Sequence, residues 1–486
     1  MSTSIPNPRD LAADLALGAL ARHGETIASL VEEYKAAGFT LALVGGPVRD
    51  AILGRLGNDL DFTTNARPDA SIKILKRWGD SIWDTGAAFG TIAAKKGLVM
   101  VEVTTYRSES YDPQTRKPDV VFGDSIEGDL SRRDFTVNAM ALELTGEHPL
   151  FIDLFDGAGD LAKKILRTPV TAYSSFSDDP LRMMRVARFV AQLNFAADPE
   201  IISAMHEMSE RLSIISAERI REEFTKTLMS PNPRAGLELL VETGLAAIFI
   251  PELPKLKLEI DEHHHHKDVY EHTLTVLDQA IAHEDRLGGA NLTIRLAALM
   301  HDIGKPRTRE LIPGGGVSFH HHEVVGAKMC KRRLKEMRFD TKTVDEVSTL
   351  VFLHLRFHGY GTGEWTDSAV RRYIRDAGEL LTHLHVLTRA DCTTRNKRKA
   401  EQLARTYDSL ELCIEELKAK EELDRIRPDL NGEQIMQVLG IRPSRFVGQA
   451  YGYLLELRME RGPLGEEIAT QELLAWASDK EFGGAK

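Results

Sequence analysis

Two glycines and two aspartates form the first pattern whose residue types suit chemistry on phosphates. Gly45 and Gly46 end a short apolar run. Glycines after a strand let the backbone approach a phosphate, and the next helix N-terminus offers it free N–H groups. Asp59 and Asp61, two apart on a predicted strand, project from one face and can share divalent metal ions. Each feature alone is common, but their order and spacing predict metal-assisted phosphoryl transfer with Asp59 and Asp61 as catalytic metal ligands.

A second set of residues has the composition of a transition-metal site. Its members follow the order histidine, histidine-aspartate, two further histidines and aspartate: His272, His301, Asp302, His322, His354 and Asp391. Imidazole together with carboxylate suits transition metals, and a metal-bound water becomes a nucleophile near neutral pH. A lone histidine is more often a packed or exposed residue than a ligand, but that explanation does not account well for a series in this order.

The block from Ser131 to Ala139, S-R-R-D-F-T-V-N-A, carries a family resemblance. With the earlier G-G-x-x-R-D and D-x-D motifs in the same order, it resembles the class II CCA-adding enzymes and their sister bacterial poly(A) polymerases, within the polymerase-β-type nucleotidyltransferases, over about residues 40–230. The resemblance implies that Asp59 and Asp61 bind catalytic Mg²⁺. It also implies nucleotide-binding roles for a further set of residues: Gly45, Gly46, Arg49, Arg132, Arg133, Asp134 and Asn138. Glu102 is either a third catalytic carboxylate or a plain exposed strand residue.

A later segment resembles the family's E-D-x-x-R motif, with Asp178 in place of glutamate. Asp179 and Arg182 are three apart, so we expect them on one helix face, where they can meet the Watson–Crick edge of a base together. Cytosine and adenine present an amino donor beside a ring-nitrogen acceptor, whereas uracil and guanine present a carbonyl beside an N–H. An ordinary surface ion pair is the alternative. Arg185 and Arg188 continue the same helix and are predicted to reach substrate phosphates.

The histidine-rich segment resembles the HD phosphohydrolase superfamily over about residues 260–395. The resemblance implies that His272, His301, Asp302 and Asp391 bind one metal ion and that His322 and His354 support a second. The identity of this divalent transition metal and the substrate stay open.

These motifs need an α/β head followed by helices, so the expected fold class is α+β. Strand patterns run to about residue 150, and helical periodicity prevails from about residue 175. The expected domains are a helical extension, a polymerase-β-type head, an all-α neck with the nucleotide-selecting motif, an HD domain and a helical tail that contacts tRNA: residues 1–35, 36–165, 166–258, 259–400 and 401–486.

Composition limits the remaining classes. The 486 residues are 42% hydrophobic and 28% charged, as in ordinary globular proteins, and no run approaches the roughly 20 apolar residues of a membrane span. A net charge of −11 argues against non-specific coating of nucleic acid. We therefore expect a cytoplasmic enzyme that does not associate with a membrane. The family resemblance implies tRNA, CTP and ATP as partners, and no obligate protein partner is expected.

The leading functional prediction is CCA addition to tRNA, with a metal-dependent phosphohydrolase activity in the HD domain. Poly(A) synthesis, or partial addition of CC or A alone, shares every head motif. A different class of protein, an RNA or nucleotide phosphohydrolase with an RNA-binding head, is the remaining alternative.

Overall fold

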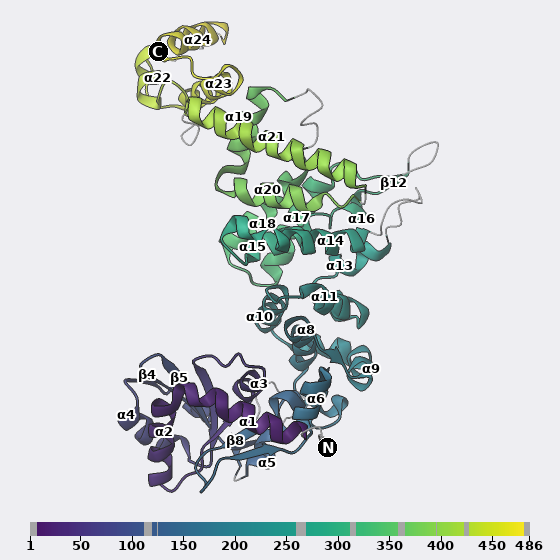
Figure 1. Cartoon of the computed structure of the whole chain (residues 1–486). Coiled ribbons are helices and arrows are strands. Elements are labelled where there is room, and N and C mark those ends of the chain that lie inside the picture. The colour runs from purple at the N-terminus through teal and green to yellow at the C-terminus, as the bar shows by residue number, and fades with distance from the viewer. Residues whose placement is uncertain are drawn as a thin grey trace. The chain divides into compact units, whose positions relative to one another are not determined.

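The computed structural model describes residues 7–110, 119–123, 125–258, 269–311, 317–357, 365–394, 396–421 and 427–480. It divides into two compact units, Met1–Pro251 and Glu252–Lys486. The first unit contains a sheet covered by helices and then a stack of helices, and the second unit is mainly helical (Figure 1). The predicted α+β class, with an α/β head before a helical body, is confirmed.

A seven-stranded sheet with the order β3-β4-β5-β2-β1-β8-β9 forms the head. Its strands are β1 (Ala42–Val44), β2 (Asp59–Thr64), β3 (Ser81–Trp83), β4 (Thr91–Lys96), β5 (Val99–Thr105), β8 (Met140–Glu143) and β9 (Leu150–Asp153). Within this sheet β2 and β5 pair in parallel, and the other neighbours are antiparallel. A separate antiparallel ladder joins β6 (Arg107–Ser110) to β7 (Asp119–Phe122). These strands agree with the strand patterns expected up to about residue 150.

Six helices accompany the head sheet: α1 (Pro8–Leu20), α2 (Gly24–Ala36), α3 (Gly46–Ile52), α4 (Pro68–Trp78), α5 (Ile126–Ser131) and α6 (Gly157–Lys163). Helix α1 packs against α3 and α6, and α2 packs against α4. Helix α2 ends at Ala36, two residues before Gly38, which adopts a left-handed conformation with φ +79°. The N-terminal helices are thus part of the first compact unit.

The helices after the head form the predicted neck. They are α7 (Ala172–Asp178), α8 (Leu181–Leu193), α9 (Pro199–Met208), α10 (Ala217–Leu228), α11 (Pro233–Glu242) and α12 (Leu245–Phe249). A two-residue parallel ladder between β10 (Ile165–Leu166) and β11 (Ala196–Ala197) accompanies them. Helix α8 packs against both α10 and α11. The hydrophobic face of α8 is buried, and its polar residue Arg185 contacts Asp134 of the head.

The second unit begins with a bundle of helices that carries the predicted metal ligands. Its helices are α13 (Glu252–Lys255), α14 (Val269–Ala282), α15 (Leu292–Met300), α16 (Lys305–Thr308), α17 (His322–Glu336), α18 (Thr341–Leu353), α19 (Asp367–Ala377), α20 (Leu381–Asp391) and α21 (Lys397–Glu421). A short ladder pairs β12 (Glu310–Leu311) with β13 (Val317–Ser318). Helices α14, α15, α18 and α20 contact one another, which brings ligands distant in sequence together.

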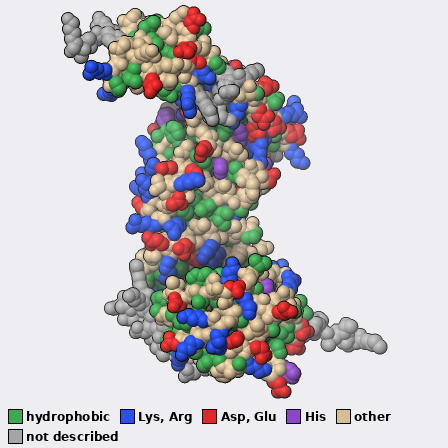
Figure 2. All heavy atoms as spheres, turned by 90° about the vertical axis from the view of Figure 1, so that its left-hand side faces the viewer, with side chains coloured by type: hydrophobic (Ala, Val, Ile, Leu, Met, Phe, Trp, Pro, Cys, Tyr) green, Lys and Arg blue, Asp and Glu red, His purple; other side chains and the backbone are tan. Residues whose placement is uncertain are grey.

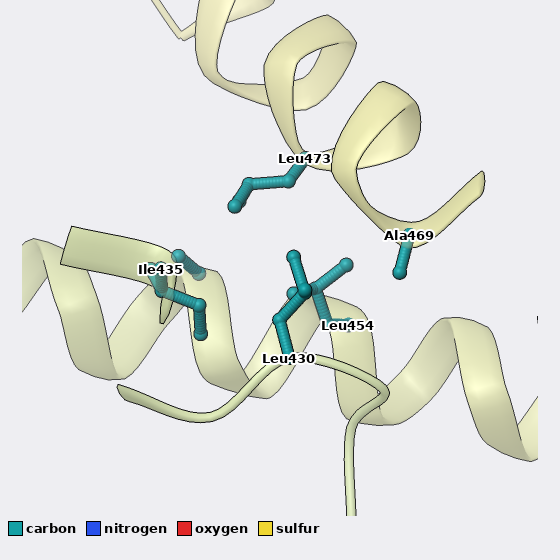
Figure 3. Packing of buried hydrophobic residues seen from close by; sticks show 6 residues of the cluster. Leu430, Ile435, Leu454, Ala469 and Leu473 are labelled. Atoms are coloured by element: carbon teal, nitrogen blue, oxygen red, sulfur yellow. The ribbon is translucent and has the colours of Figure 1, made fainter. Parts of the chain in front are cut away.

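Three tail helices share a small core of their own. They are α22 (Gly432–Leu439), α23 (Arg445–Arg461) and α24 (Glu466–Asp479). Figure 3 shows Leu430, Ile435, Leu454 and Leu473 directed toward one another between these helices, with Ala469 beside them. The cluster is buried, so the tail is stabilised largely by apolar burial.

Two arginines of the second unit, Arg371 and Arg333, are occupied by structural contacts. Arg371 is buried and donates to the Met459 carbonyl in the last turn of α23 at 3.1 Å, where a cation complements the helix dipole. Arg333 pairs with Glu252 at 2.8 Å. On the face shown in Figure 2, basic and acidic side chains are interspersed. In the described ranges no helix is long and apolar enough to cross a membrane.

Candidate active site and metal centre

Three carboxylates share the exposed face of two adjacent head strands. Along β2 the side chains of Asp59 and Asp61 are exposed while Leu60 and Phe62 are buried, so the predicted common face is correct. Asp61 lies opposite Glu102 on β5 in the parallel register. Desolvation first, then Glu102 and Asp59, raises the pKa of Asp61 to about 6 against the opposing charge of Arg133. Such a site favours a divalent cation, and hard carboxylate oxygens are the donors that Mg²⁺ prefers.

The glycine turn lies at the end of β1, where the sequence predicted strand, turn and helix. Gly45 has φ +75° and ψ −137°, and Gly46 begins α3. A Cβ atom on Gly45 would lie 2.7 Å from Nη1 of Arg133. Glycine is therefore required at position 45 both by the backbone conformation and by the approach of a guanidinium.

The predicted nucleotide-binding residues of the head form one hydrogen-bonded chain with the neck. Arg49 donates to Oδ1 of Asn138 at 2.6 Å, and Asn138 donates to Oδ1 of Asp134 at 3.0 Å. Arg185 on α8 donates through Nε to Oδ2 of Asp134 at 2.8 Å. Burial alone would raise the pKa of Asp134, but Arg185 and Asn138 outweigh it and the pKa falls to about 2. Asp134 is therefore an ionised link between head and neck.

Arg132 and Arg133 are both anchored by Asp129, a residue that sequence reasoning missed. Arg132 lies 2.8 Å and Arg133 3.1 Å from its two carboxylate oxygens, and Asp129 is fully buried. The spacings of three and four residues near the end of α5 were a usable signal, because such neighbours meet on a helix. Arg133, held in this way, also reaches the glycine turn, since a Cβ atom on Gly45 would lie 2.7 Å from its Nη1.

Phe189 on α8 is surrounded by three of the predicted phosphate-binding arginines. The guanidinium carbons of Arg188, Arg49 and Arg185 lie 4.4, 5.3 and 5.6 Å from its ring centroid. Arg188 also lies 3.3 Å from the buried carboxylate of Glu223 on α10. The arrangement gathers three cations around one buried ring and holds each of them in place.

The expectation that Asp179 and Arg182 share a helix face is wrong. Asp179 is extended, with φ −138° and ψ 101°, and α8 begins only at Leu181. The reason is Pro180, since the residue before a proline is disfavoured in the helical conformation. Asp179 accepts the N–H of Leu181 at 3.0 Å and an N–H of Arg219 at 3.1 Å.

Arg182 does lie on α8, but it is buried and holds internal partners. It donates to Oγ of Ser175 at 2.9 Å and to the backbone carbonyl of Arg132. These bonds use two of the five N–H donors of its guanidinium. Arg182 therefore connects the neck to the block that starts at Arg132. Arg182 contacts Asp179 only through the backbone in the bonds described, where its N–H donates to the Asp179 carbonyl at 3.0 Å.

The six predicted metal ligands of the second unit converge on one centre. Their donor atoms form two groups, each within 4.8 Å: His272, His301 and Asp391, and Asp302, His322 and His354. Asp302 links the groups, because Oδ2 lies 3.2 Å from Nε2 of His301 while Oδ1 lies 3.3 Å from Nε2 of His322. The predicted ligands are thus brought together from α14, α17, α20 and the ends of α15 and α18.

Hydrogen bonding prepares the imidazoles for a cation. Three of them have Nδ1 on a backbone carbonyl three residues earlier: His301 on Ala298 at 2.8 Å, His322 on Phe319 at 2.8 Å and His354 on Val351 at 2.6 Å. In neutral rings a protonated Nδ1 leaves an Nε2 lone pair. Nε2 of His322 faces Nε2 of His354 at 3.3 Å. Two nitrogen lone pairs at that distance repel each other unless both nitrogens bind the same metal ion. The donor set therefore fits a transition metal.

Burial and nearby charges shift the pKa values of two histidines at this centre in opposite directions. Burial lowers the pKa of His301, but Asp302 and Asp391 outweigh it and raise the pKa to about 8. Burial, with the charge of His301, lowers the pKa of His354 to about 4. Lys305 lies 2.7 Å from Oδ2 of Asp302 and is a further contact that sequence reasoning did not assign.

Gly304 allows the turn after Asp302 to lie directly on α17. A Cβ atom there would lie 2.2 Å from the His322 carbonyl oxygen and 2.8 Å from the Gly326 nitrogen. Both are backbone atoms that no rotamer change can move. The glycine therefore sets how closely His322 approaches Asp302.

A sheet of this order with paired carboxylates, followed by a helical bundle with clustered histidines, defines a polymerase-β-type nucleotidyltransferase head with an HD domain. Three families match the chain: "Poly A polymerase head domain" over residues 41–167, "Probable RNA and SrmB- binding site of polymerase A" over 194–256, and "HD domain" over 269–396. An A-adding tRNA nucleotidyltransferase of Deinococcus radiodurans is 32% identical over 450 residues, covering 90% of this chain and 96% of that protein. The chain therefore belongs to the class II family of tRNA nucleotidyltransferases and poly(A) polymerases, with a fused HD domain.

Other similarities are shorter or structural. A CCA-adding enzyme of Lactobacillus johnsonii is 40% identical over 218 residues, which cover 45% of this chain and 53% of that enzyme. The chain thus matches about half the length of such relatives. A crystal structure of Bacillus stearothermophilus CCA-adding enzyme in complex with CTP aligns with TM-score 0.65 and 24% identity, covering 98% of this chain and 99% of that one. This likeness supports the fold.

Proposed function

We propose that this protein adds nucleotides to the 3′ end of tRNA, building CCA from CTP and ATP without a template. The observation that carries the proposal is the exposed carboxylate face of Asp59, Asp61 and Glu102. In this proposal Glu102 is the third ligand of the site, a role supported by its register opposite Asp61.

The head residues have complementary tasks in this reaction. The backbone at Gly45 and Gly46 approaches the triphosphate, and Arg49, Arg133 and Arg185 neutralise its charge. Bound Mg²⁺ supplies activation of the primer hydroxyl and stabilisation of the pyrophosphate leaving group. The remaining proposed nucleotide contacts are Arg132, Asp134, Asn138 and Arg188. Because Asp134 and Asn138 already bind arginines, their first task is to orient those cations.

Base choice is proposed to rest on Asp179 and Arg182 after a local rearrangement. The ion pair between Asp179 and Arg219 involves an Arg219 side chain that is 51% exposed, so opening it costs only about 0–1 kcal/mol. Arg182 keeps donors beyond the two that its internal bonds use. A carboxylate acceptor and a guanidinium donor then complement cytosine or adenine and leave uracil or guanine mismatched.

The test is an end-by-end primer assay. tRNA lacking zero, one, two or three terminal nucleotides is incubated with Mg²⁺ and with CTP, ATP or both. CCA addition requires extension of every truncated end to a common length and no extension of the complete one. Asp59→Ala or Asp61→Ala should lower the rate by about 10³-fold or more, while tRNA affinity changes only a few-fold. Asp69→Ala, an exposed carboxylate on α4, is the matched control.

A-addition is the second candidate, and a specific observation favours it. The relative matched along 90% of this chain is named an A-adding enzyme. In that case only tRNA ending in CC is extended, with ATP alone. Continued extension with ATP would instead identify a poly(A) polymerase, and extension with CTP alone a CC-adding enzyme.

The HD domain is proposed to be a metal-dependent phosphohydrolase for RNA ends. A 3′ phosphate or 2′,3′-cyclic phosphate on damaged tRNA leaves no free 3′ hydroxyl, so its removal would regenerate a primer for the head. A divalent transition metal held by His272, His301, Asp302 and Asp391, with His322 and His354, would supply a water-derived nucleophile. The chain's own residues orient that ion through the carbonyl-bound imidazoles.

This second activity is tested separately from the first. Hydrolysis of terminal and cyclic phosphates is measured with Mg²⁺, Mn²⁺, Ni²⁺ and Co²⁺, using the double variant His301→Ala with Asp302→Ala. We expect loss of hydrolysis and unchanged addition to intact primers, with His283→Ala as control. Hydrolysis that survives the double variant would refute the assignment. Hydrolysis without any nucleotide addition by the wild type would favour the alternative of a phosphohydrolase with an RNA-binding head.

We also propose that the extension, head, neck and HD domain end at residues 35, 165, 258 and 400, and that the tail after them contacts tRNA. The proposed tRNA substrate agrees with the cytoplasmic location expected from the sequence. Removal of residues 401–486 should then raise the Kd for full-length tRNA more than that for a short acceptor stem.

A further inference from the structure

The two ligand groups of the HD centre differ in exposure. In the group of Asp302, His322 and His354, the exposed fractions are 1%, 9% and 1%. In the other group His272 and Asp391 are 18% and 21% exposed. Solvent therefore reaches the second group more easily, and a bound ion there can exchange with less disturbance of the protein.

The groups also differ in how their imidazoles are held. His322 and His354 are fixed through backbone carbonyls, which a side-chain substitution cannot remove. His272 instead has Nδ1 3.1 Å from the hydroxyl oxygen of Thr393, in the segment after α20. When Nδ1–H donates to that hydroxyl, the Nε2 lone pair faces the metal position; when the hydroxyl donates to Nδ1, the proton is on Nε2 and the ring cannot bind metal. The orientation of His272 therefore depends on a replaceable side chain.

A positive charge already competes for the Asp302 oxygen that faces the more exposed group, although Asp302 itself belongs to the buried group. Nζ of Lys305 lies 2.7 Å from Oδ2 of Asp302. The same oxygen lies 3.2 Å from His301 and 3.5 Å from His272. An ion on that side must share this carboxylate oxygen with an ammonium group, which weakens its binding. The other oxygen, Oδ1, faces His322.

We propose that the HD centre binds two metal ions of unequal affinity and that Thr393 is a positioning residue for the weaker one. The tighter ion is held by Asp302, His322 and His354, and the weaker, exchangeable ion by His272, His301 and Asp391. The inference rests on the proposed metal-binding function of this domain. It adds which position exchanges and which side chain sets its affinity.

The experiment titrates the metal-free full-length chain with Co²⁺, followed by calorimetry and by visible absorption. The background carries Asp59→Ala and Asp61→Ala, so that head carboxylates do not contribute. We expect two separate binding events. Thr393→Val, which keeps the shape but removes the hydroxyl, should weaken only the weaker event by about 10–100-fold. Thr393→Ser should stay within about 3-fold of the parent.

Further variants separate positioning from a general structural role. His322→Ala should remove the tighter event. The thermal midpoint of metal-free Thr393→Val should match that of the parent, and Thr393→Ala provides a second test if the valine variant does not fold. Two events of equal affinity, or a Thr393→Val effect on both events or on neither, would overturn the inference. Absence of any Co²⁺ or Mn²⁺ binding by the parent would refute the proposed metal centre itself.

Discussion

Replacing Gly45 by alanine tests the head site most directly, because the structure predicts both a backbone and a side-chain cost. Alanine prefers negative φ, and the combination of φ +75° with ψ −137° at Gly45 lies outside its allowed regions. Holding a non-glycine residue in such a region costs about 1–3 kcal/mol. The new Cβ would also lie 2.7 Å from Nη1 of Arg133, so the guanidinium must move.

The movement has a second cost that can be estimated from the contacts of Arg133. Its 3.1 Å bond to the buried Asp129 would lengthen or break, and a hydrogen bond between charged groups contributes about 1.5–3 kcal/mol. The sum is about 2–6 kcal/mol. For a unit of this size that lowers the thermal midpoint by roughly 4–24 °C. The midpoint of the head transition is followed by calorimetry.

Gly46→Ala is the matched control for the backbone argument. Gly46 lies inside α3, and its nearest contact for a Cβ is Arg49 at 3.5 Å, an ordinary distance. Gly46→Ala should change the free energy of unfolding by no more than about 1 kcal/mol, so its thermal midpoint should stay close to that of the wild type. Both variants should raise the KM for ATP, since a methyl group obstructs approach of the triphosphate to the turn. A wild-type midpoint for Gly45→Ala would refute the strain argument, and a wild-type KM for Gly46→Ala would refute the phosphate contact.

Four further substitutions test other parts of the two sites. Without metal, Asp61→Asn should be more stable than the wild type at pH 8 and should lose this advantage toward pH 4. The reason is that the pKa of Asp61 is raised to about 6, so its ionisation disfavours the folded state. Thermal unfolding measured against pH tests this, and Mg²⁺ should stabilise only the wild type. Asp179→Ala or Arg182→Ala should raise UTP or GTP incorporation relative to CTP and ATP by about 10-fold or more in competition assays, and unchanged selectivity in both would mean a structural role. Gly304→Ala should abolish Co²⁺ binding by the HD centre, since its Cβ would meet backbone 2.2 Å away, while nucleotide addition persists; full binding would contradict this account.

The sequence was most informative where the signal was local. Alternation along β2 predicted the common face of Asp59 and Asp61, and the glycine pair predicted the turn before α3. Side-chain direction in a strand depends only on position parity, and a positive φ demands glycine, so neither needs knowledge of distant residues. The six residues that cluster as candidate metal ligands were also identified from the sequence, because their order does not depend on how the intervening chain folds.

Partners set by the tertiary fold were beyond such reasoning. Nothing local to Arg182 indicates that it donates to the carbonyl of Arg132, 50 residues earlier. Thr393 likewise meets His272 across 121 residues. The error at Asp179 was different: Pro180 was visible, and its effect on the preceding residue was sufficient to place the helix start correctly.

The confinement of each site to its own unit sets an order of events during synthesis. All proposed head residues precede Pro251, whereas the HD centre is incomplete until Asp391 has been made. At about 5–20 residues per second, translation between these two positions takes on the order of 10–30 s. The head can therefore acquire its fold on the ribosome while His272 and His301 still lack the carboxylate of Asp391. If the HD centre binds metal as proposed, its loading is a late step, and chains released before Asp391 would carry a folded head and an incomplete HD ligand set.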